Sequence, residues 1–190
     1  MTKKELRAAM RRKNLGITPS ERAAASGRIF GRIGRLEAFA RARTVGVFCS
    51  LADEPDTSEA LARWSAAGKR LAVPRVEGDV MRFYAYDPRT MRPGAFGIAE
   101  PGPEAPECEP QELDLVIVPG TAFTAAGARM GRGRGYYDKY LSQPEVHAVK
   151  IGVCFAHQLV GELPAEPHDV AMDYVVTDLS LIHISAPTRQ

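Results

Sequence analysis

Apolar residues recur at helical spacing in some parts of the chain and form short continuous runs in others. Residues 2–14 carry their apolar side chains on one face of a helix whose opposite face is basic. A second helix is expected to begin at Thr18 and Pro19, because threonine favours the N-cap and proline the first helical position. Thr57 is expected to cap a third helix, and residues 136–141 to open a fourth.

The short apolar runs are rich in β-branched residues, which is typical of β-strands. The expected strands cover residues 44–49, 70–74, 80–86, 113–118, 149–155 and, as the last one, 174–177. The run at 113–118 is the most apolar, which indicates a central strand. Strands separated by helices favour one α/β domain, in which a mostly parallel sheet has helices on both faces.

A proline-rich stretch at residues 87–112 interrupts this alternation. Its prolines are Pro88, Pro93, Pro101, Pro103, Pro106 and Pro110. We therefore expect a long irregular connection here, and connections of this length are often functional.

Composition and charge narrow the classes of function. The 190 residues carry a formal net charge of +2, so no global field draws the chain to nucleic acid or to an anionic membrane. No apolar run approaches the ~18 residues of a membrane span. Cys49, Cys108 and Cys154 are odd in number and widely spaced, which argues against a disulfide framework and a Cys-rich zinc site. We expect a cytoplasmic protein with no nucleic-acid or membrane partner.

The most informative stretch is RMGRGRGYYD at residues 129–138, where glycines alternate with arginines before a predicted helix. Alternating glycines let backbone N–H groups converge on one point, and the helix N-terminus adds a partial positive charge. Arg129, Arg132 and Arg134 can donate bidentate hydrogen bonds to phosphate oxygens. Asp138, in the first helical turn, can hold a cation that bridges those phosphates. The stretch therefore predicts a phosphate site with a bound cation.

The loop does not match two common phosphate-binding motifs. It lacks the Gly-Lys-Ser/Thr of a Walker A loop, and Tyr136 stands where a dinucleotide fingerprint has its third glycine. A solvated Gly-Arg turn is the plain alternative to a phosphate site. An RNA-binding module that uses Arg-Gly and Tyr residues is another, although the Arg-Gly run is one short loop between predicted core elements rather than a long tail.

Together with Val118–Phe123 and Gly127, the loop resembles the signature of 5-formyltetrahydrofolate cyclo-ligases, also called methenyltetrahydrofolate synthetases. Further matches follow in the family's order between residues 3 and 178. They are Lys3 with Arg7, Asp53-Glu54 with Thr57, Phe96-Gly97-Ile98 with Glu100-Pro101, and Leu163-Pro164 with His168-Asp169. The resemblance implies a single three-layer α/β/α domain, Rossmann-like, over residues 1–178, which acts as a monomer.

The resemblance also implies an activity. The family uses ATP and Mg²⁺ to convert 5-formyltetrahydrofolate into 5,10-methenyltetrahydrofolate, with release of ADP and phosphate. The formyl oxygen attacks the γ-phosphate, and N10 of the folate then closes the ring. Phosphoryl transfer needs mainly positioning and charge neutralisation, which suits a Gly-Arg loop. A diverged homologue that binds ATP but lacks cyclo-ligase activity is the alternative.

The resemblance assigns roles to individual residues. The expected ATP contacts are Lys3, Arg7, Arg129, Gly131, Gly133, Gly135, Tyr136 and Tyr137. The expected folate contacts are Cys49, Glu54, Arg132, Gly133, Arg134, Gly135 and Tyr136. Arg132 and Arg134 are also the expected catalytic residues, because they can stabilise transition-state charge. Asp138 and Asp169 are the expected Mg²⁺ ligands, with Asp169 bound directly or through water.

Several side chains keep two interpretations. Glu54 can hydrogen-bond the pterin amino group or serve as a capping or surface residue. Phe83, Tyr84 and Phe96 can stack on a heterocycle or pack in the core. His168 is expected to be structural, beside Asp169.

Two features depart from the family pattern. Arg134 stands where the family often has glycine or lysine. Residues 179–190 match nothing expected of the family, so we expect them to lie outside the domain, as an artefact of sequencing or cloning.

Overall fold

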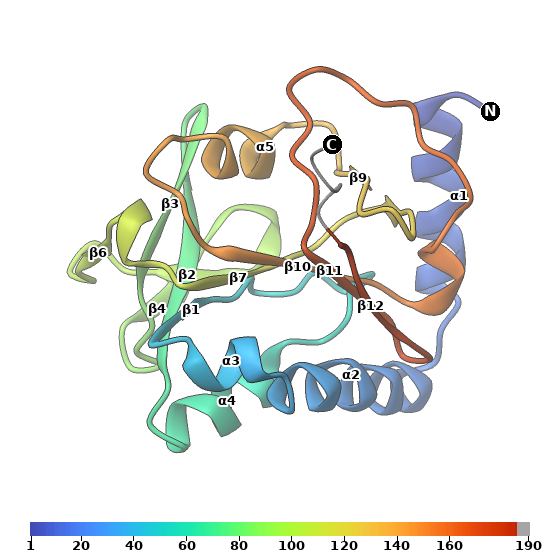
Figure 1. The fold of residues 1–190 in the computed structure, drawn as a ribbon. Helices are drawn as coiled ribbons and strands as arrows, with labels where there is room; N and C mark the ends of the chain where they lie inside the picture. Colours follow the sequence, from blue (N-terminus) through green and yellow to red (C-terminus); the bar gives the residue numbers. More distant parts are fainter. Residues whose placement is uncertain (186–190) are drawn as a thin grey trace.

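The structure, a computed structural model, describes residues 1–185. Its main feature is an eight-stranded sheet in the order β12-β11-β10-β7-β1-β2-β3-β6 (Figure 1). The bounds are β1 Thr44–Gly46, β2 Arg70–Glu77, β3 Val80–Ala85, β6 Glu107–Cys108, β7 Leu115–Val118, β10 Val149–Val153, β11 Tyr174–Val176 and β12 Leu181–His183. Adjacent strands from β11 to β2 are parallel, whereas β3, β6 and β12 pair antiparallel.

The five parallel strands are arranged 2-1-3-4-5 in chain order, which is one of the two common doubly wound orders. The first and third of them, β1 and β7, are neighbours, and the chain leaves them in opposite directions along the sheet. Ligands of such sheets bind outside the carboxyl ends of these two strands. As predicted, the apolar run that forms β7 is central and fully buried.

Helices cover both faces of the sheet, as the helix–strand alternation predicted. They are α1 Lys3–Leu15, α2 Pro19–Gly34, α3 Glu37–Arg41, α4 Ser58–Ala66 and α5 Tyr136–Leu141. In Figure 1, α2, α3 and α4 lie on one face and α5 on the other. Ile29, Phe30 and Trp64 belong to the apolar cluster under the first group, and Tyr140 and Leu141 to the cluster under α5. No helix among residues 1–185 is long and apolar enough to span a membrane.

Of the two predicted helix caps, one forms and one does not. The Thr18 side chain caps α2 as predicted, and Thr2 and Glu5 form a capping box on α1 that was not predicted. Thr57 precedes α4 but makes no capping hydrogen bond. Its hydroxyl instead accepts a hydrogen bond from the Ser50 backbone N–H at 3.2 Å, so the predicted cap is wrong.

The expected irregular connection 87–112 contains more regular structure than the prolines suggested. β4 Met91–Pro93 pairs antiparallel with β5 Ala99–Pro101, and a 3₁₀ turn over Ala95–Gly97 joins them. A second hairpin, β8 Ala122–Phe123 with β9 Arg129–Met130, was also not predicted. Strands this short give no periodic signal along the sequence.

The strand expected to be the last one is followed by another. Residues 181–183, expected to lie outside the domain, form β12 on the edge of β11. The last part of that expected tail, residues 186–190, lies outside the described residues.

Gly152 in β10 packs directly against the buried ring of Phe123. A Cβ at this position would overlap with Cε1 of that ring. Gly152→Ala is therefore expected to lower the free energy of unfolding by about 1–3 kcal/mol, the usual cost of overpacking a core. Gly27→Ala in α2, where a Cβ has no neighbour within 4 Å, is the control and is expected to stabilise by about 0.5–1 kcal/mol. Denaturant titration measures both, and equal effects would contradict the packing argument.

Candidate functional site

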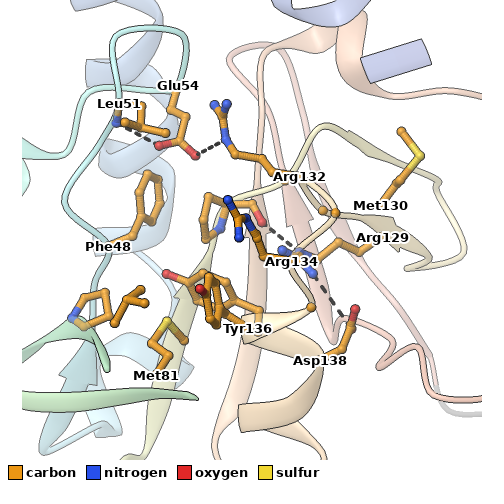
Figure 2. A pocket seen from close by; sticks show the side chains of 18 of the residues that line it. Phe48, Leu51, Glu54, Met81, Arg129, Met130, Arg132, Arg134, Tyr136 and Asp138 are labelled. Carbon is orange, nitrogen blue, oxygen red and sulfur yellow. Dashed lines mark hydrogen bonds and ion pairs between the residues drawn. The ribbon is translucent and has the colours of Figure 1, made fainter. Parts of the chain in front are cut away.

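A cavity of about 590 Å³ opens at the carboxyl ends of β1 and β7 (Figure 2). Phe48 and Cys49 follow β1 on one wall, and Pro119 and Gly120 follow β7 on another. Every residue predicted as a site residue lines this cavity. They are Lys3, Arg7, Cys49, Glu54, Arg129, Gly131, Arg132, Gly133, Arg134, Gly135, Tyr136, Tyr137, Asp138 and Asp169.

The glycines of the 129–138 loop let it pass close to charged side chains. A Cβ on Gly131 would lie 2.9 Å from Nη2 of Arg129, so a larger residue would displace that guanidinium. Gly135 has a φ of 72° at the N-cap of α5, a conformation that glycine adopts without strain. The loop can therefore follow the cavity wall and then turn directly into α5.

Arg129 is the most buried cation of the site, with a side chain only 6% exposed. Its Nε donates a hydrogen bond to the Pro119 carbonyl oxygen at 2.7 Å, and Nη1 lies 3.8 Å from Oδ1 of Asp138. The guanidinium also lies over the Tyr137 ring, 5.3 Å from its centroid. Burial lowers the pKa of Arg129, and the nearby Asp138 carboxylate opposes that shift.

The N-terminal helix brings two more cations to the cavity. Arg7 Nε donates to the Gly131 carbonyl oxygen at 3.0 Å, which ties α1 to the loop. Lys3 forms an ion pair with Glu166, and this hydrogen bond is the main cause of a lowered Glu166 pKa.

The carboxylates of the site fall into two places. Asp138 accepts the Val170 backbone N–H on Oδ1 at 3.2 Å. Asp169 groups with Glu166 and His168, and one ligand atom from each of these three lies within 4.8 Å of the others. His168 Nε2 lies 3.0 Å from Oε2 of Glu166. Within residues 1–185, a three-residue group able to hold an ion thus contains Asp169 but not Asp138.

The opposite wall carries a buried acid and a thiol. Glu54 is 7% exposed, and its Oε1 accepts the Leu51 backbone N–H at 2.8 Å, so it is neither a helix cap nor a surface residue. Burial raises the pKa of Glu54, whereas Arg132 acts in the opposite direction. Burial also raises the pKa of Cys49 to about 11, so this thiol stays protonated at neutral pH.

The two arginines predicted to be catalytic have different surroundings. Arg132 Nη2 donates to Oδ1 of Asp53 at 2.5 Å, and its Nε lies 3.6 Å from Oε2 of Glu54. Arg134 is exposed and forms no ion pair within the described part of the chain. In Figure 2, Arg132 is turned toward Glu54, whereas Arg129 is directed to Asp138.

The aromatic residues that could stack on a ligand differ in how deeply they are buried. Phe83 and Tyr84 are buried in the structure and do not line the cavity, so the core interpretation holds for both. Phe96 lines the cavity and is 63% exposed, in the left-handed conformation with φ 61°. Tyr136 donates a hydrogen bond to the Gly78 carbonyl oxygen at 3.3 Å. Tyr137 packs against both apolar clusters of the core.

Sequence reasoning gave no role to some residues that the fold places in or beside the cavity. Asp53, the partner of Arg132, lies 79 positions away in sequence, and Glu166, the partner of Lys3, lies 163 positions away. Phe48 and Met81 form apolar wall and are typical strand residues in sequence. In the sequence, only position pointed to these two acids. Asp53 directly precedes Glu54, and Glu166 lies just before His168-Asp169.

The comparisons with known proteins identify the family. The sequence model of the 5-formyltetrahydrofolate cyclo-ligase family matches residues 1–178. A 5-formyltetrahydrofolate cyclo-ligase of Mycolicibacterium smegmatis is 35% identical over 142 residues, which cover 71% of this chain and 73% of that protein. The enzyme of that name from Escherichia coli is 31% identical over 176 residues, 88% of this chain and 96% of that protein.

A solved structure extends the likeness to the whole fold. Aquifex aeolicus 5,10-methenyltetrahydrofolate synthetase is 30% identical and superposes with a TM-score of 0.88, covering 100% of this chain and 96% of that one. Sequence, fold and the convergence of the signature residues on one cavity lead to the same conclusion. This chain belongs to the 5-formyltetrahydrofolate cyclo-ligase family.

Proposed function

We propose that this chain catalyses the ATP- and Mg²⁺-dependent cyclisation of 5-formyltetrahydrofolate to 5,10-methenyltetrahydrofolate, with release of ADP and phosphate. The observation that carries this proposal is the convergence of signature residues from positions 3 to 169 on a single cavity. Its volume of about 590 Å³ is in the range of small-molecule sites. The wall near Phe48 and Met81 is apolar, whereas the Gly-Arg loop is basic.

The basic side is suited to a triphosphate. Arg129, Arg7 and Lys3 come from two separate elements and surround the loop glycines. Because Arg129 is buried, its charge is screened little by water and acts strongly on a bound phosphate. Arg132 and Arg134 would stabilise the negative charge that develops during phosphoryl transfer.

The residues also fit Mg²⁺, which prefers oxygen ligands. Asp138 and Asp169 would hold the ion, and it would neutralise triphosphate charge. Asp138 uses Oδ1 for the Val170 N–H and for Arg129, which leaves Oδ2 to a cation. Asp169 accepts the Glu166 N–H on Oδ2 at 2.7 Å, so its Oδ1 is the oxygen available for direct or water-mediated binding.

The opposite wall is suited to the folate. Glu54 offers a buried carboxylate oxygen to the amino group of the pterin, and Cys49 contributes a neutral wall. The exposed ring of Phe96 at the β4–β5 turn is available to stack on a bound heterocycle.

We further infer that a single copy of the chain is active, because every side chain given a role lines one cavity. Cys49, Cys108 and Cys154 are free thiols, as expected for a protein of the reducing cytoplasm.

The test follows product absorbance with purified protein, 5-formyltetrahydrofolate, ATP and Mg²⁺. We expect 5,10-methenyltetrahydrofolate to form only when all three are present, with one ADP released for each product molecule. Replacing ATP with ADP, or adding a chelator, is expected to abolish the signal. Folded protein that binds ATP but forms no product would contradict the proposal and favour the diverged homologue.

A further inference from the structure

Arg132 is held by two acidic side chains of the segment 51–54. Its Nη2 lies 2.5 Å from Oδ1 of Asp53 and its Nε lies 3.6 Å from Oε2 of Glu54. The two carboxylates are buried, with side chains 9% and 8% exposed, whereas Arg132 itself is 43% exposed. A charge-assisted pair with two buried acids is among the stronger contacts that a surface arginine can make.

This pairing places the Nε–Nη2 edge of Arg132 against the acidic segment, whereas Arg129, Arg7 and Lys3 are the cations proposed to bind the triphosphate. Figure 2 shows its guanidinium directed to Glu54, while Arg129 from the same loop is directed to Asp138. The N–H groups that face Asp53 and Glu54 are not available to a phosphate. Arg132 can therefore offer its Nε–Nη2 edge to a phosphoryl group only after it leaves at least one of these carboxylates.

Of the two partners, Asp53 is the one whose position is fixed. Asn14, 6% exposed in α1, donates its Nδ2 to the Asp53 carbonyl oxygen at 2.9 Å. The Asn14 Oδ1 is in turn 2.5 Å from Nε2 of His157. Because the backbone of Asp53 is anchored to a helix, the exposed side chain of Arg132 is the part that can move.

A second cavity of about 270 Å³ lies beside this pair. Asp53, Arg132, Arg7 and Arg11 all line it. The guanidinium of Arg11, which has no proposed role at the triphosphate, thus lines the same cavity as Asp53 when Arg132 leaves it. Glu54 does not line this second cavity, and its side-chain partners among residues 1–185 are the Leu51 N–H and Arg132, so a ligand would supply the replacement for Arg132.

The cost of releasing Arg132 depends on what replaces it at Glu54. A buried carboxylate left without its cation is strongly unfavourable. A triphosphate that recruited Arg132 alone would bear this cost, and its affinity would fall accordingly. A ligand that brings N–H donors to Glu54 removes the cost, and the triphosphate then binds more tightly.

We propose that Asp53 is a positioning residue that holds Arg132 away from the triphosphate until N–H donors of the folate reach Glu54. This inference rests on the proposed function, because it uses the same two ligands. It predicts that the substrates bind cooperatively, with each raising the affinity for the other by the same factor. Asp53 thereby favours phosphoryl transfer only when the acceptor is present.

The test measures binding of a non-hydrolysable ATP analogue with and without 5-formyltetrahydrofolate, by calorimetry with Mg²⁺ present. In the unsubstituted chain we expect the folate to tighten analogue binding by about 5-fold or more, the lower end of typical coupling. In Asp53→Asn the analogue is expected to bind several-fold more tightly without folate, and the coupling to fall below about 2-fold. Asp53→Glu, which keeps the charge, is expected to retain most of the coupling.

Two further variants separate this role from a structural one. Asp56→Asn is the matched control, since Asp56 follows Asp53 by three residues, pairs with Arg22 at 3.6 Å and does not line the cavity. We expect it to keep the original coupling. Arg132→Ala is expected to lose the coupling and to bind the analogue more weakly, opposite in direction to Asp53→Asn.

The outcomes distinguish the inference from the proposed function. If Asp53→Asn keeps the full coupling, or weakens analogue binding as Arg132→Ala does, the inference is wrong while ring closure by the unsubstituted chain still supports the function. If the unsubstituted chain neither binds the folate nor closes the ring, both are wrong. Thermal melting verifies that the variants fold, and Asp53→Ala replaces Asp53→Asn if the latter does not.

Discussion

Replacing Asp138 with asparagine is expected to lower the rate of ring closure by about 10²–10³-fold, equivalent to about 3–4 kcal/mol of transition-state stabilisation. Asparagine keeps an acceptor oxygen for the Val170 N–H, which Asp138 binds at 3.2 Å, so the start of α5 stays in place. What disappears is the negative charge proposed to hold Mg²⁺. The rate measured against Mg²⁺ concentration is therefore expected to show a higher half-saturating concentration together with a lower maximum.

Asp173→Asn is the matched control for this substitution. Asp173 also accepts a backbone N–H, from Lys150 at 2.8 Å, but it does not line the cavity. We expect its rate and Mg²⁺ dependence to match those of the unsubstituted chain. An Asp138→Asn variant with an unchanged Mg²⁺ requirement would remove Asp138 from the metal site and leave the group of Glu166, His168 and Asp169 as the candidate.

The elements with strong local signals were predictable from the sequence. The Thr18-Pro19 start of α2 and the apolar run of β7 both lie where the pattern placed them. The Gly-Arg loop was identified because its residue mix suits few purposes other than binding an anion. The predicted buried strand 113–118 ends where the cavity opens, and the Gly-Arg loop lines that same cavity.

The features that sequence reasoning missed depend on pairing partners that the apolar and polar pattern does not specify. Threonine is a common capping residue, but the Thr57 hydroxyl accepts a hydrogen bond from the Ser50 backbone N–H instead. The short strands β8 and β9 exist because their backbones pair with each other, not because of any apolar periodicity. The contact between Arg132 and Asp53 likewise joins two loops that only the sheet order brings together. Local patterns thus located the Gly-Arg loop but not its contact with Asp53.

The second large effect is expected from Arg129→Lys, which keeps the charge but loses the planar guanidinium. Arg129 spans the Pro119 carbonyl oxygen at 2.7 Å and the Asp138 carboxylate at 3.8 Å, and it lies over the Tyr137 ring. A compact ammonium cannot reach both groups and a phosphate at once, so kcat/KM is expected to fall by about 10²–10³-fold.

Activity of Arg129→Lys is also expected to decline further as pH rises. Burial at this position lowers the pKa of Arg129, and it would lower that of an amine in the same place from its ordinary value of about 10.4. The amine would then lose its proton at a pH where the guanidinium remains charged.

Arg75→Lys is the control, because Arg75 also lies over a tyrosine ring and donates to backbone carbonyls but does not line the cavity. We expect this control to change thermal stability while its pH–rate profile stays that of the unsubstituted chain. Identical pH–rate profiles for Arg129→Lys and the unsubstituted chain would mean that the buried cation acts only on the fold, through Pro119 and Asp138, and not on the triphosphate.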